Sequence, residues 1–418
     1  MPTASVPNSL TRSVRELRIR NYLVHQDTTI SLSPLTVFVG PHGGGKSALF
    51  DAMLNFSMVS RGNLRQAFGP YPYSFKATIH RAASRVSRIG FKVSLARNKE
   101  SDEFLEYEID YAQTGYAEDE PAFSIPNERV TKQPGGFVLF DRSDPDAFPI
   151  TRSVELQNDR SLFASIRQAQ LAGGTIAADD LLLYCTEQIS RFNKFRLDPV
   201  MLAQPSRLPD PSRTAAPRLG YHGEDLAATL YYLSEAKDPT LEVIREKVAA
   251  IDPQFVSFEF NAVGTERIAF AARYSDARQL VPSVRLSSGT LIYLGLITLV
   301  STSNRPPVLM IEEPENGLTP QAVKSFYAAV RGLAYNENLE QRSQVLICSH
   351  SPYVICEAWN GEDRDFIHQV KVVDGKAKIR KFSAVVAEQG IHLRKDKIGT
   401  RTILGLANAE EIMAGYLS

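Results

Sequence analysis

The segment Gly40–Ser47, GPHGGGKS, constrains the fold of this chain more than any other feature. It follows the apolar run LTVFV, which has the composition of a buried strand, and it precedes SALFDAMLNFSMV, which has helical spacing of apolar residues. Small residues let successive backbone amides turn towards phosphate oxygens, and the helix adds the positive end of its dipole. This strand, turn and helix predict a phosphate-binding loop within an α/β fold.

Each residue type in the loop has its own predicted task. Lys46 is expected to reach the β- and γ-phosphates of ATP, and the Ser47 hydroxyl is expected to bind Mg²⁺. The alternative is a glycine-rich turn with an exposed lysine, and the flanking strand and helix favour the phosphate loop. The residues predicted to contact the nucleotide here are Gly40, Pro41, His42, Gly43, Gly44, Gly45, Lys46, Ser47 and Ala48.

The segment VLMIEEPENGLTP, residues 308–320, adds two acidic groups. Its apolar start is typical of a buried strand, and the bend at EEPE lets two neighbouring side chains face one cavity. We expect Glu312 to organise Mg²⁺ and its water shell, and Glu313 to polarise the attacking water. The alternative is a pair of solvated carboxylates at a strand end, which the apolar residues before them and PENGLTP after them disfavour.

Two more segments complete the set. LSSGT, residues 286–290, begins an apolar helix, so Ser287, Ser288 and Gly289 are predicted to bind an anion, although the same string also makes an ordinary helix cap. Its place shortly before the acidic strand favours a phosphate contact. QVLICSHSP is an apolar strand that ends in His350, which is predicted to touch the γ-phosphate, whereas most lone histidines are structural.

The totals exclude several classes of protein. With 418 residues and 43% hydrophobic content the chain can bury a large core, and its 47 basic and 47 acidic residues give no overall pull towards nucleic acid or membrane. Cys185, Cys348 and Cys356 are too few and scattered for a disulfide framework or a thiolate metal site, so buried, reduced thiols are expected. Without a signal peptide or a membrane span, the sequence predicts a cytoplasmic protein.

Charge is segregated in one region. Residues 52–99 contain nine Lys or Arg and no acid, whereas residues 100–120 contain nine Asp or Glu and no base. One interpretation is an antiparallel hairpin whose facing strands pair opposite charges. The other is a nucleic-acid contact through Arg81, Arg85 and Arg88, whose spacing puts them on one face of a helix.

Taken together, the four segments resemble the ABC-type ATPases of the RecF, SMC and OLD branch, especially stand-alone ATPases with an AAA_21-type head. LRIRNYLVHQDTTISLSPLTVFVGPHGGGKS is similar to that group's opening strands and Walker A, and LSSGTLIYLGLITLV to the ABC signature. IEEPENGLTP is similar to Walker B and the D-loop, and SHSPYV to the switch-histidine loop. The resemblance implies an α/β P-loop NTPase of the ABC-type head fold, with a mixed sheet core, a β-rich lobe and a compact α-rich insertion.

This resemblance divides the chain into three predicted parts. Residues 1–135 are expected to form an N-terminal ATPase lobe with Walker A and a β-hairpin, and residues 136–255 a helical insertion or lid. Residues 256–418 are expected to form a C-terminal ATPase lobe with the signature, Walker B, D-loop and switch histidine. Within the insertion, apolar spacing predicts helices around 161–170 and 178–192.

The resemblance also implies a reaction and partners. Mg²⁺-dependent ATP hydrolysis is expected, with Lys46, Glu313 and His350 as catalytic residues. Two heads are expected to dimerise head to tail on ATP, so that Ser288 and Gly289 complete the partner's site. A protein effector encoded nearby is the expected target, in DNA repair or in defence against phages and mobile elements. The alternative is a nucleotide-gated clamp or sensor on DNA or an effector, with little turnover.

Some positions depart from the family pattern. His42 stands where the family usually has asparagine, and Glu312 stands where Walker B often has aspartate. Both changes are expected to be tolerated, with slow turnover as one consequence. Gln157 is the candidate for the glutamine of the Q-loop. The segment after His350 is too short for the acidic TOPRIM nuclease domain that OLD proteins carry.

Overall fold

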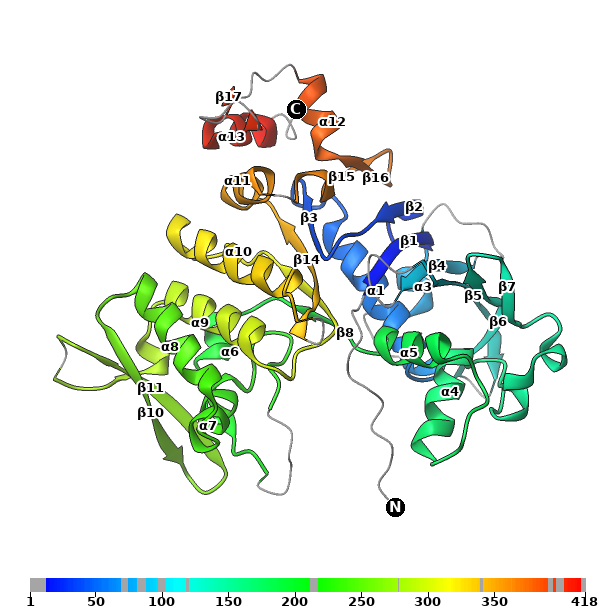
Figure 1. Cartoon of the computed structure of the whole chain (residues 1–418), viewed down its shortest axis with the longest axis horizontal. Coiled ribbons are helices and arrows are strands. Elements are labelled where there is room, and N and C mark those ends of the chain that lie inside the picture. The colour runs from blue at the N-terminus through cyan, green and yellow to red at the C-terminus, as the bar shows by residue number, and fades with distance from the viewer. Residues whose placement is uncertain are drawn as a thin grey trace.

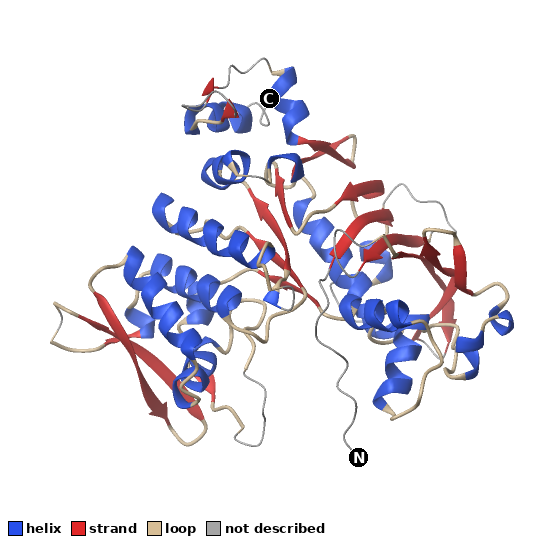
Figure 2. Ribbon diagram, viewed as in Figure 1, coloured by secondary structure: helices blue, strands red, loops and turns tan. Residues whose placement is uncertain are grey.

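A central sheet joins two lobes in the computed structural model (Figures 1 and 2).

The described residues include only one of the three arginines proposed to contact nucleic acid. Arg81 and Arg85 lie outside the described residues, and Arg88 is exposed. The structure describes residues 13–68, 74–80, 88–96, 102–117, 120–210, 217–276, 278–338, 341–361, 363–389, 394–395 and 402–414.

The central sheet has six strands in the order β16-β15-β3-β14-β13-β8. Five of them run parallel and β16 is antiparallel to β15. All five residues of β13 are buried, which fits an apolar run covered on both faces. Parallel strands end at one edge, so the loops after β3, β8, β13 and β14 meet there. The bounds are β3 Leu35–Val39, β8 Phe192–Phe195, β13 Val308–Glu312, β14 Gln344–Ser349, β15 Ile367–Val373 and β16 Lys376–Lys381.

The β-rich lobe is built on an antiparallel sheet in the order β2-β1-β4-β5-β6-β7. Helices α1, α4 and α5 share one hydrophobic core with this sheet. The sheet strands are β1 Ser13–Tyr22, β2 His25–Ser31, β4 Ile89–Ala96, β5 Phe104–Ala117, β6 Glu120–Gln133 and β7 Phe137–Asp141. The helices of this lobe are α1 Lys46–Val59, α2 Leu64–Phe68, α3 Phe75–Thr78, α4 Leu162–Leu171 and α5 Asp180–Ile189, with short 3₁₀ turns at Pro145–Ala147 and Pro149–Arg152.

The predicted charge-paired hairpin is confirmed. Strands β4 and β5 pair in antiparallel register, with Lys92 opposite Glu108, and the ammonium of Lys92 lies 3.2 Å from Glu106. From β1, Arg20 donates to Glu108 and Asp110, at 2.8 Å each. The acidic strand β5 therefore neutralises basic side chains on its neighbour β4 and on β1, the next strand beyond β4.

The second lobe is mainly helical and packs against the other face of the central sheet. Its ribbon of β10 and β11 covers α7 and α8 at the lower left of Figure 1. The helices are α6 Pro199–Leu202, α7 Leu226–Glu235, α8 Pro239–Ile251, α9 Ser288–Ser301 and α10 Pro320–Ala334. The strands are β9 Ser206–Arg207, β10 Phe255–Val263, β11 Arg267–Tyr274 and β12 Val281–Pro282, with a 3₁₀ turn at Ser283–Arg285.

The C-terminal elements lie at the top of Figure 1, with α11 beside β15 and with α12 and α13 above it. Among the described helices, none has the length and apolar character needed to cross a membrane. Cys185 and Cys348 are buried free thiols, as predicted, whereas Cys356 on α11 is free but only half-buried, so its predicted burial is wrong. These elements are α11 Pro352–Asn360, the 3₁₀ turn Arg364–Phe366, α12 Phe382–Glu388, β17 Arg394–Lys395, β18 Thr402–Ile403 and α13 Leu406–Ala414.

Residues 136–255, the predicted helical insertion, contribute to three different parts of the structure. Helices α4 and α5 belong to the core of the β-rich lobe, α7 and α8 to the core of the helical lobe, and β8 to the central sheet. The helix expected over 178–192 ends at Ile189, because Phe192 begins β8. The three-part division of the chain stays a prediction, and the cores group its middle part differently.

Candidate functional site

The glycine-rich loop connects β3 to α1, as predicted. Gly43 and Gly45 have φ values of 73° and 96°, which glycine adopts without a steric penalty. Gly40 lies against the backbone of β15, where an added Cβ would be 2.1 Å from the Val370 carbonyl oxygen. A left-handed turn and a close backbone approach therefore require glycine at these positions.

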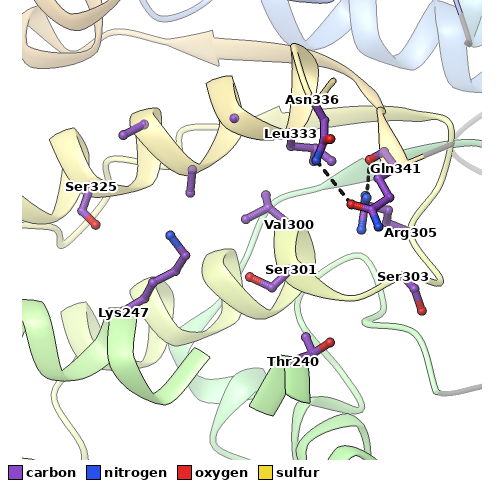
Figure 3. Close-up of a pocket in the computed structure, with 13 residues that line it drawn as sticks. Thr240, Lys247, Val300, Ser301, Ser303, Arg305, Ser325, Leu333, Asn336 and Gln341 are labelled. Atoms are coloured by element: carbon purple, nitrogen blue, oxygen red, sulfur yellow. Dashed lines mark hydrogen bonds between the residues drawn. The ribbon is translucent and has the colours of Figure 1, made fainter. Parts of the chain in front are cut away.

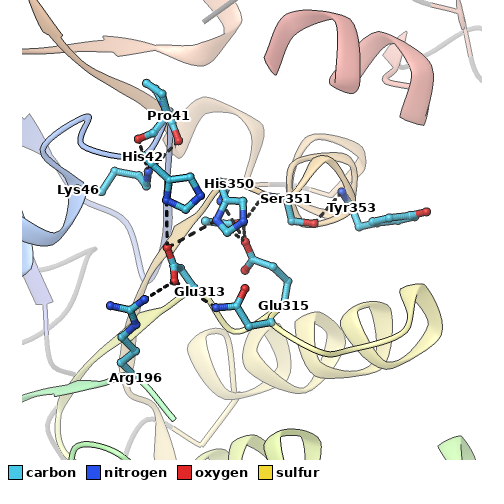
Figure 4. Close-up of polar contacts among 12 residues, drawn as sticks. Pro41, His42, Lys46, Arg196, Glu313, Glu315, His350, Ser351 and Tyr353 are labelled. Carbon is cyan, nitrogen blue, oxygen red and sulfur yellow. Dashed lines mark hydrogen bonds and ion pairs between the residues drawn. The ribbon is translucent and has the colours of Figure 1, made fainter. Parts of the chain in front are cut away.

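The side chain of Lys46 folds back over the loop (Figure 4). Its ammonium donates to the carbonyl oxygens of Gly40, at 2.7 Å, and Pro41, at 2.9 Å. Burial lowers the pKa of Lys46, while Cys348 and the acidic residues nearby oppose this shift. The ammonium thus lies inside the turn of the loop, where phosphate oxygens can replace the two carbonyl acceptors.

Glu313 follows β13 in a left-handed conformation, with a φ of 48°. Its amide donates to the Cys348 carbonyl at 2.8 Å, which fixes this bend. The Glu313 carboxylate accepts from Arg196 at 2.9 Å and from Asn316 at 3.1 Å. Burial would raise the pKa of Glu313, but Arg196, Asn316 and two nearby histidines outweigh burial, so the pKa lies below its usual value.

Two histidines flank the Glu313 carboxylate (Figure 4). The Nδ1 atoms of His42 and His350 lie 3.9 and 3.7 Å from Glu313 Oε1, and the two ring centroids are 4.6 Å apart. Glu315 holds the second histidine, because its Oε1 accepts from the Ser349 hydroxyl at 2.7 Å and from the His350 amide at 3.0 Å. The histidine of the phosphate loop therefore meets the histidine after β14 at the predicted base.

Glu312 is buried on the other side of this edge. Its Oε2 lies 3.3 Å from the Lys194 ammonium and accepts from the Tyr221 hydroxyl at 3.3 Å. Lys194 also donates to Asp51 at 2.7 Å, and Asp51 lies one turn of α1 after Ser47. Within the described part of the chain, Glu312 Oε1 is buried without a hydrogen-bond partner. An oxygen donor of this kind fits a Mg²⁺ site shared with the Ser47 hydroxyl.

The signature segment forms the start of α9. Ser287 caps this helix by accepting from the Thr290 amide at 3.0 Å, and Ser287 and Ser288 are both exposed. An added Cβ at Gly289 would lie 2.5 Å from the Gly317 carbonyl oxygen, so the signature packs on the D-loop. Among the described residues, no hydrogen bond or ion pair joins Ser287, Ser288 or Gly289 to the phosphate loop of the same chain.

Sequence reasoning missed the side chains that hold the two acids. Lys194, Arg196 and Glu315 all contact the site, and the signal for the first two is FNKFR, in which two cations alternate at the end of a short strand. The proposal of Gln157 for the Q-loop stays a prediction. Its amide donates to Glu155 at 3.2 Å, whereas the residue that follows β8 at this edge is Arg196.

A large cavity lies elsewhere, among α8, α9 and α10 (Figure 3). Its volume is about 750 Å³, and none of the predicted nucleotide-site residues lines it. Cavity size alone therefore does not locate the candidate site. The polar residues that line it include Thr240, Lys247, Ser301, Arg305 and Ser325.

A family model matches this chain over most of its length. The AAA_21 model, described as "AAA domain, putative AbiEii toxin, Type IV TA system", covers residues 35–356. The chain belongs to the AAA_21 family. The description as an AAA domain agrees with the α/β fold of the central sheet and with the phosphate loop between β3 and α1, as the resemblance implied. The match spans the glycine loop, the signature, the acidic strand and the switch histidine of this AAA_21 chain.

Several solved structures are similar to this AAA_21 protein. An SMC head bound to the C-winged helix domain of ScpA is 13% identical, with a TM-score of 0.49, and covers 88% of this chain and 97% of its own. The SMC head domain from Thermotoga maritima is 14% identical, with a TM-score of 0.40, over 88% and 98%. An SMC head bound to the C-terminal domain of ScpA from Pyrococcus furiosus is 12% identical, with a TM-score of 0.45, over 91% and 100%. No curated protein matches the sequence.

Proposed function

We propose that this protein is a Mg²⁺-dependent ATPase that closes head to tail on ATP and thereby drives or gates a partner. The observation that carries the proposal is the position of Glu313. Its carboxylate lies beside His42 of the phosphate loop and is kept ionised by Arg196. An ionised carboxylate next to the γ-phosphate position is what activation of an attacking water needs.

The other residues take complementary roles. Lys46 and the loop amides bind the phosphates, while Ser47 and Glu312 hold the metal ion. Mg²⁺, when bound, neutralises charge on the phosphate oxygens. Glu313 polarises the attacking water, and His350, held by Glu315, donates a hydrogen bond to the γ-phosphate.

Dimerisation follows from the exposed signature. At the N-terminus of α9, Ser288 is exposed and Gly289 is half-buried, and among the described residues no hydrogen bond joins either to the phosphate loop of the same chain. Helix N-termini favour anions, so the γ-phosphate of a second head is the ligand that we assign to this one. ATP then joins two heads because each site is completed by the partner.

Light scattering tests this proposal with the Glu313→Gln protein, which is expected to hold ATP without turnover. We expect a dimer with ATP and a monomer without it, and we expect Ser288→Arg to abolish the dimer. Ser275→Arg is the matched control, because Ser275 is an exposed serine after β11. A Glu313→Gln protein that stays monomeric with ATP, or a Ser288→Arg variant that still dimerises, contradicts the composite site.

A second candidate is a nucleotide-gated clamp or sensor with little turnover. The ion pair between Arg196 and Glu313 favours it, because this pair engages the carboxylate that hydrolysis needs. Single-turnover phosphate release separates the two, since a clamp binds ATP but releases phosphate very slowly. The family description names a putative toxin of a Type IV TA system, and on that ground we propose defence against phages or mobile elements rather than DNA repair. The target that we propose is a protein effector encoded nearby.

A further inference from the structure

Lys194 is a buried cation at the metal side of the site. It lies on β8, the parallel neighbour of β13, and its side chain is only 7% exposed. The ammonium lies 2.7 Å from Asp51 Oδ1, 3.3 Å from Glu312 Oε2 and 5.2 Å from the centre of the Tyr221 ring. The ammonium is therefore enclosed between two carboxylates, one from α1 and one from β13.

The two carboxylates depend on this ammonium. Asp51 and Glu312 come from α1 and β13, and Lys194 bridges them. Burial raises the pKa of Asp51, while Lys194 opposes that shift. Without the ammonium, the buried Glu312 carboxylate and the partly exposed Asp51 carboxylate would lack a shared counter-charge, which a divalent cation can supply.

A divalent cation would use the same Glu312 carboxylate through its other oxygen. Glu312 Oε1, which has no hydrogen-bond partner in the described part of the chain, lies on the carboxylate whose other oxygen Lys194 contacts. No group of three or more His, Cys, Asp or Glu placed to hold a metal occurs among the described residues. The positive charge that the structure places beside these two carboxylates is the Lys194 ammonium.

We propose that Lys194 is a built-in counter-ion of the metal site, so that the site takes a divalent cation only together with the nucleotide phosphates. This inference rests on the proposed Mg²⁺-ATP site. The phosphate oxygens add negative charge and ligands that a single Glu312 carboxylate, already paired with Lys194, does not supply. Lys194 is thus a positioning residue for Glu312 and Asp51, and it sets the order in which the ligands enter.

Binding of Mn²⁺ alone, measured by electron paramagnetic resonance on nucleotide-free protein, tests the inference. We expect no specific Mn²⁺ binding by the parent, and affinity raised at least tenfold in Lys194→Met because Asp51 and Glu312 are released. Lys194→Arg keeps the charge and is expected to behave as the parent. Adding Asp51→Asn to Lys194→Met is expected to remove most of the gain. An unchanged affinity in Lys194→Met, or tight Mn²⁺ binding by the nucleotide-free parent, overturns the proposal.

Two controls separate the site from the fold. Lys378→Met removes an exposed lysine on β16 and is expected to leave Mn²⁺ binding unchanged. Lys194→Gln keeps a polar head group and replaces Lys194→Met in the test if the methionine variant does not fold. We expect the same gain in Mn²⁺ affinity, and an unchanged affinity would again overturn the proposal. The two proposals fail in different experiments. A parent that does not bind an ATP analogue refutes the proposed ATPase. Mn²⁺ binding by the Lys194 variants without nucleotide tests only the role of Lys194 as a counter-ion.

Discussion

Arg196 and Glu313 form an ion pair of 2.9 Å between the ends of two parallel strands, although they are 117 residues apart in the sequence. The pair exists because β8 and β13 are neighbours in the central sheet, so the residues that follow them meet at one edge. It holds the carboxylate in its ionised form and fixes its direction. The proposed base is therefore set by a strand that lies outside all four sequence motifs.

Replacement of Arg196 is expected to change the pH dependence of turnover. The pKa of Glu313 lies below its usual value, so the carboxylate stays ionised as the pH falls. In Arg196→Gln this pKa rises, and the base becomes protonated at a higher pH. The acid limb of kcat/KM against pH should therefore move to higher pH. Arg191→Gln, which breaks a surface pair with Glu187, is the control, and an acid limb that does not move contradicts the assignment.

Replacement of Lys46 is expected to weaken ATP binding itself. In Lys46→Ala the phosphates lose a charge-assisted hydrogen bond, which is worth about 1.5–3 kcal/mol and corresponds to a loss of roughly 10- to 150-fold in affinity. Equilibrium fluorescence with a labelled ATP analogue measures the loss. Lys324→Ala removes an exposed lysine on α10 and serves as the control. Equal affinity in Lys46→Ala and the parent would exclude Lys46 from the site.

How much of this site could be predicted depends on how far apart in the sequence its contacting residues lie. The phosphate loop could be predicted because its strand, turn and helix are contiguous in the sequence. Its glycines are a local signal too, since the Val370 carbonyl leaves no room for a Cβ at Gly40. The β4–β5 hairpin was predictable from opposite charges on adjacent segments. Lys194 and Asp51 lie 143 residues apart, and only the strand order of the central sheet brings them together. No local pattern encodes that order, so the cations of β8 were missed.

Glu128 should be a strong determinant of stability. It is fully buried and accepts from Arg142 at 2.9 Å, from the Tyr107 hydroxyl at 2.6 Å and from the Leu162 amide at 2.7 Å. Glu128→Ala leaves these three donors without their acceptor and an uncompensated charge in the β-rich lobe. Breaking a buried pair in this way costs about 3–5 kcal/mol.

Urea unfolding followed by circular dichroism measures this loss. Glu187→Ala, which removes one partner of a surface pair, is the control, and it should change the free energy of unfolding by only about 0–1 kcal/mol. Similar midpoints for Glu128→Ala and Glu187→Ala would show that the buried network does not stabilise the lobe.

The two adjacent acids should separate binding from hydrolysis. Glu313→Gln preserves the shape of the side chain and its contact with Asn316 but removes the base, so phosphate release should slow by roughly 10²- to 10⁴-fold with ATP affinity retained. Glu312→Gln should instead raise the Mg²⁺ concentration needed for turnover, because the lost carboxylate, which lies beside Lys194, is the proposed metal ligand. Phosphate release over a Mg²⁺ series distinguishes them. Near-normal turnover in Glu313→Gln, with loss of turnover in Glu312→Gln, would exchange the two roles.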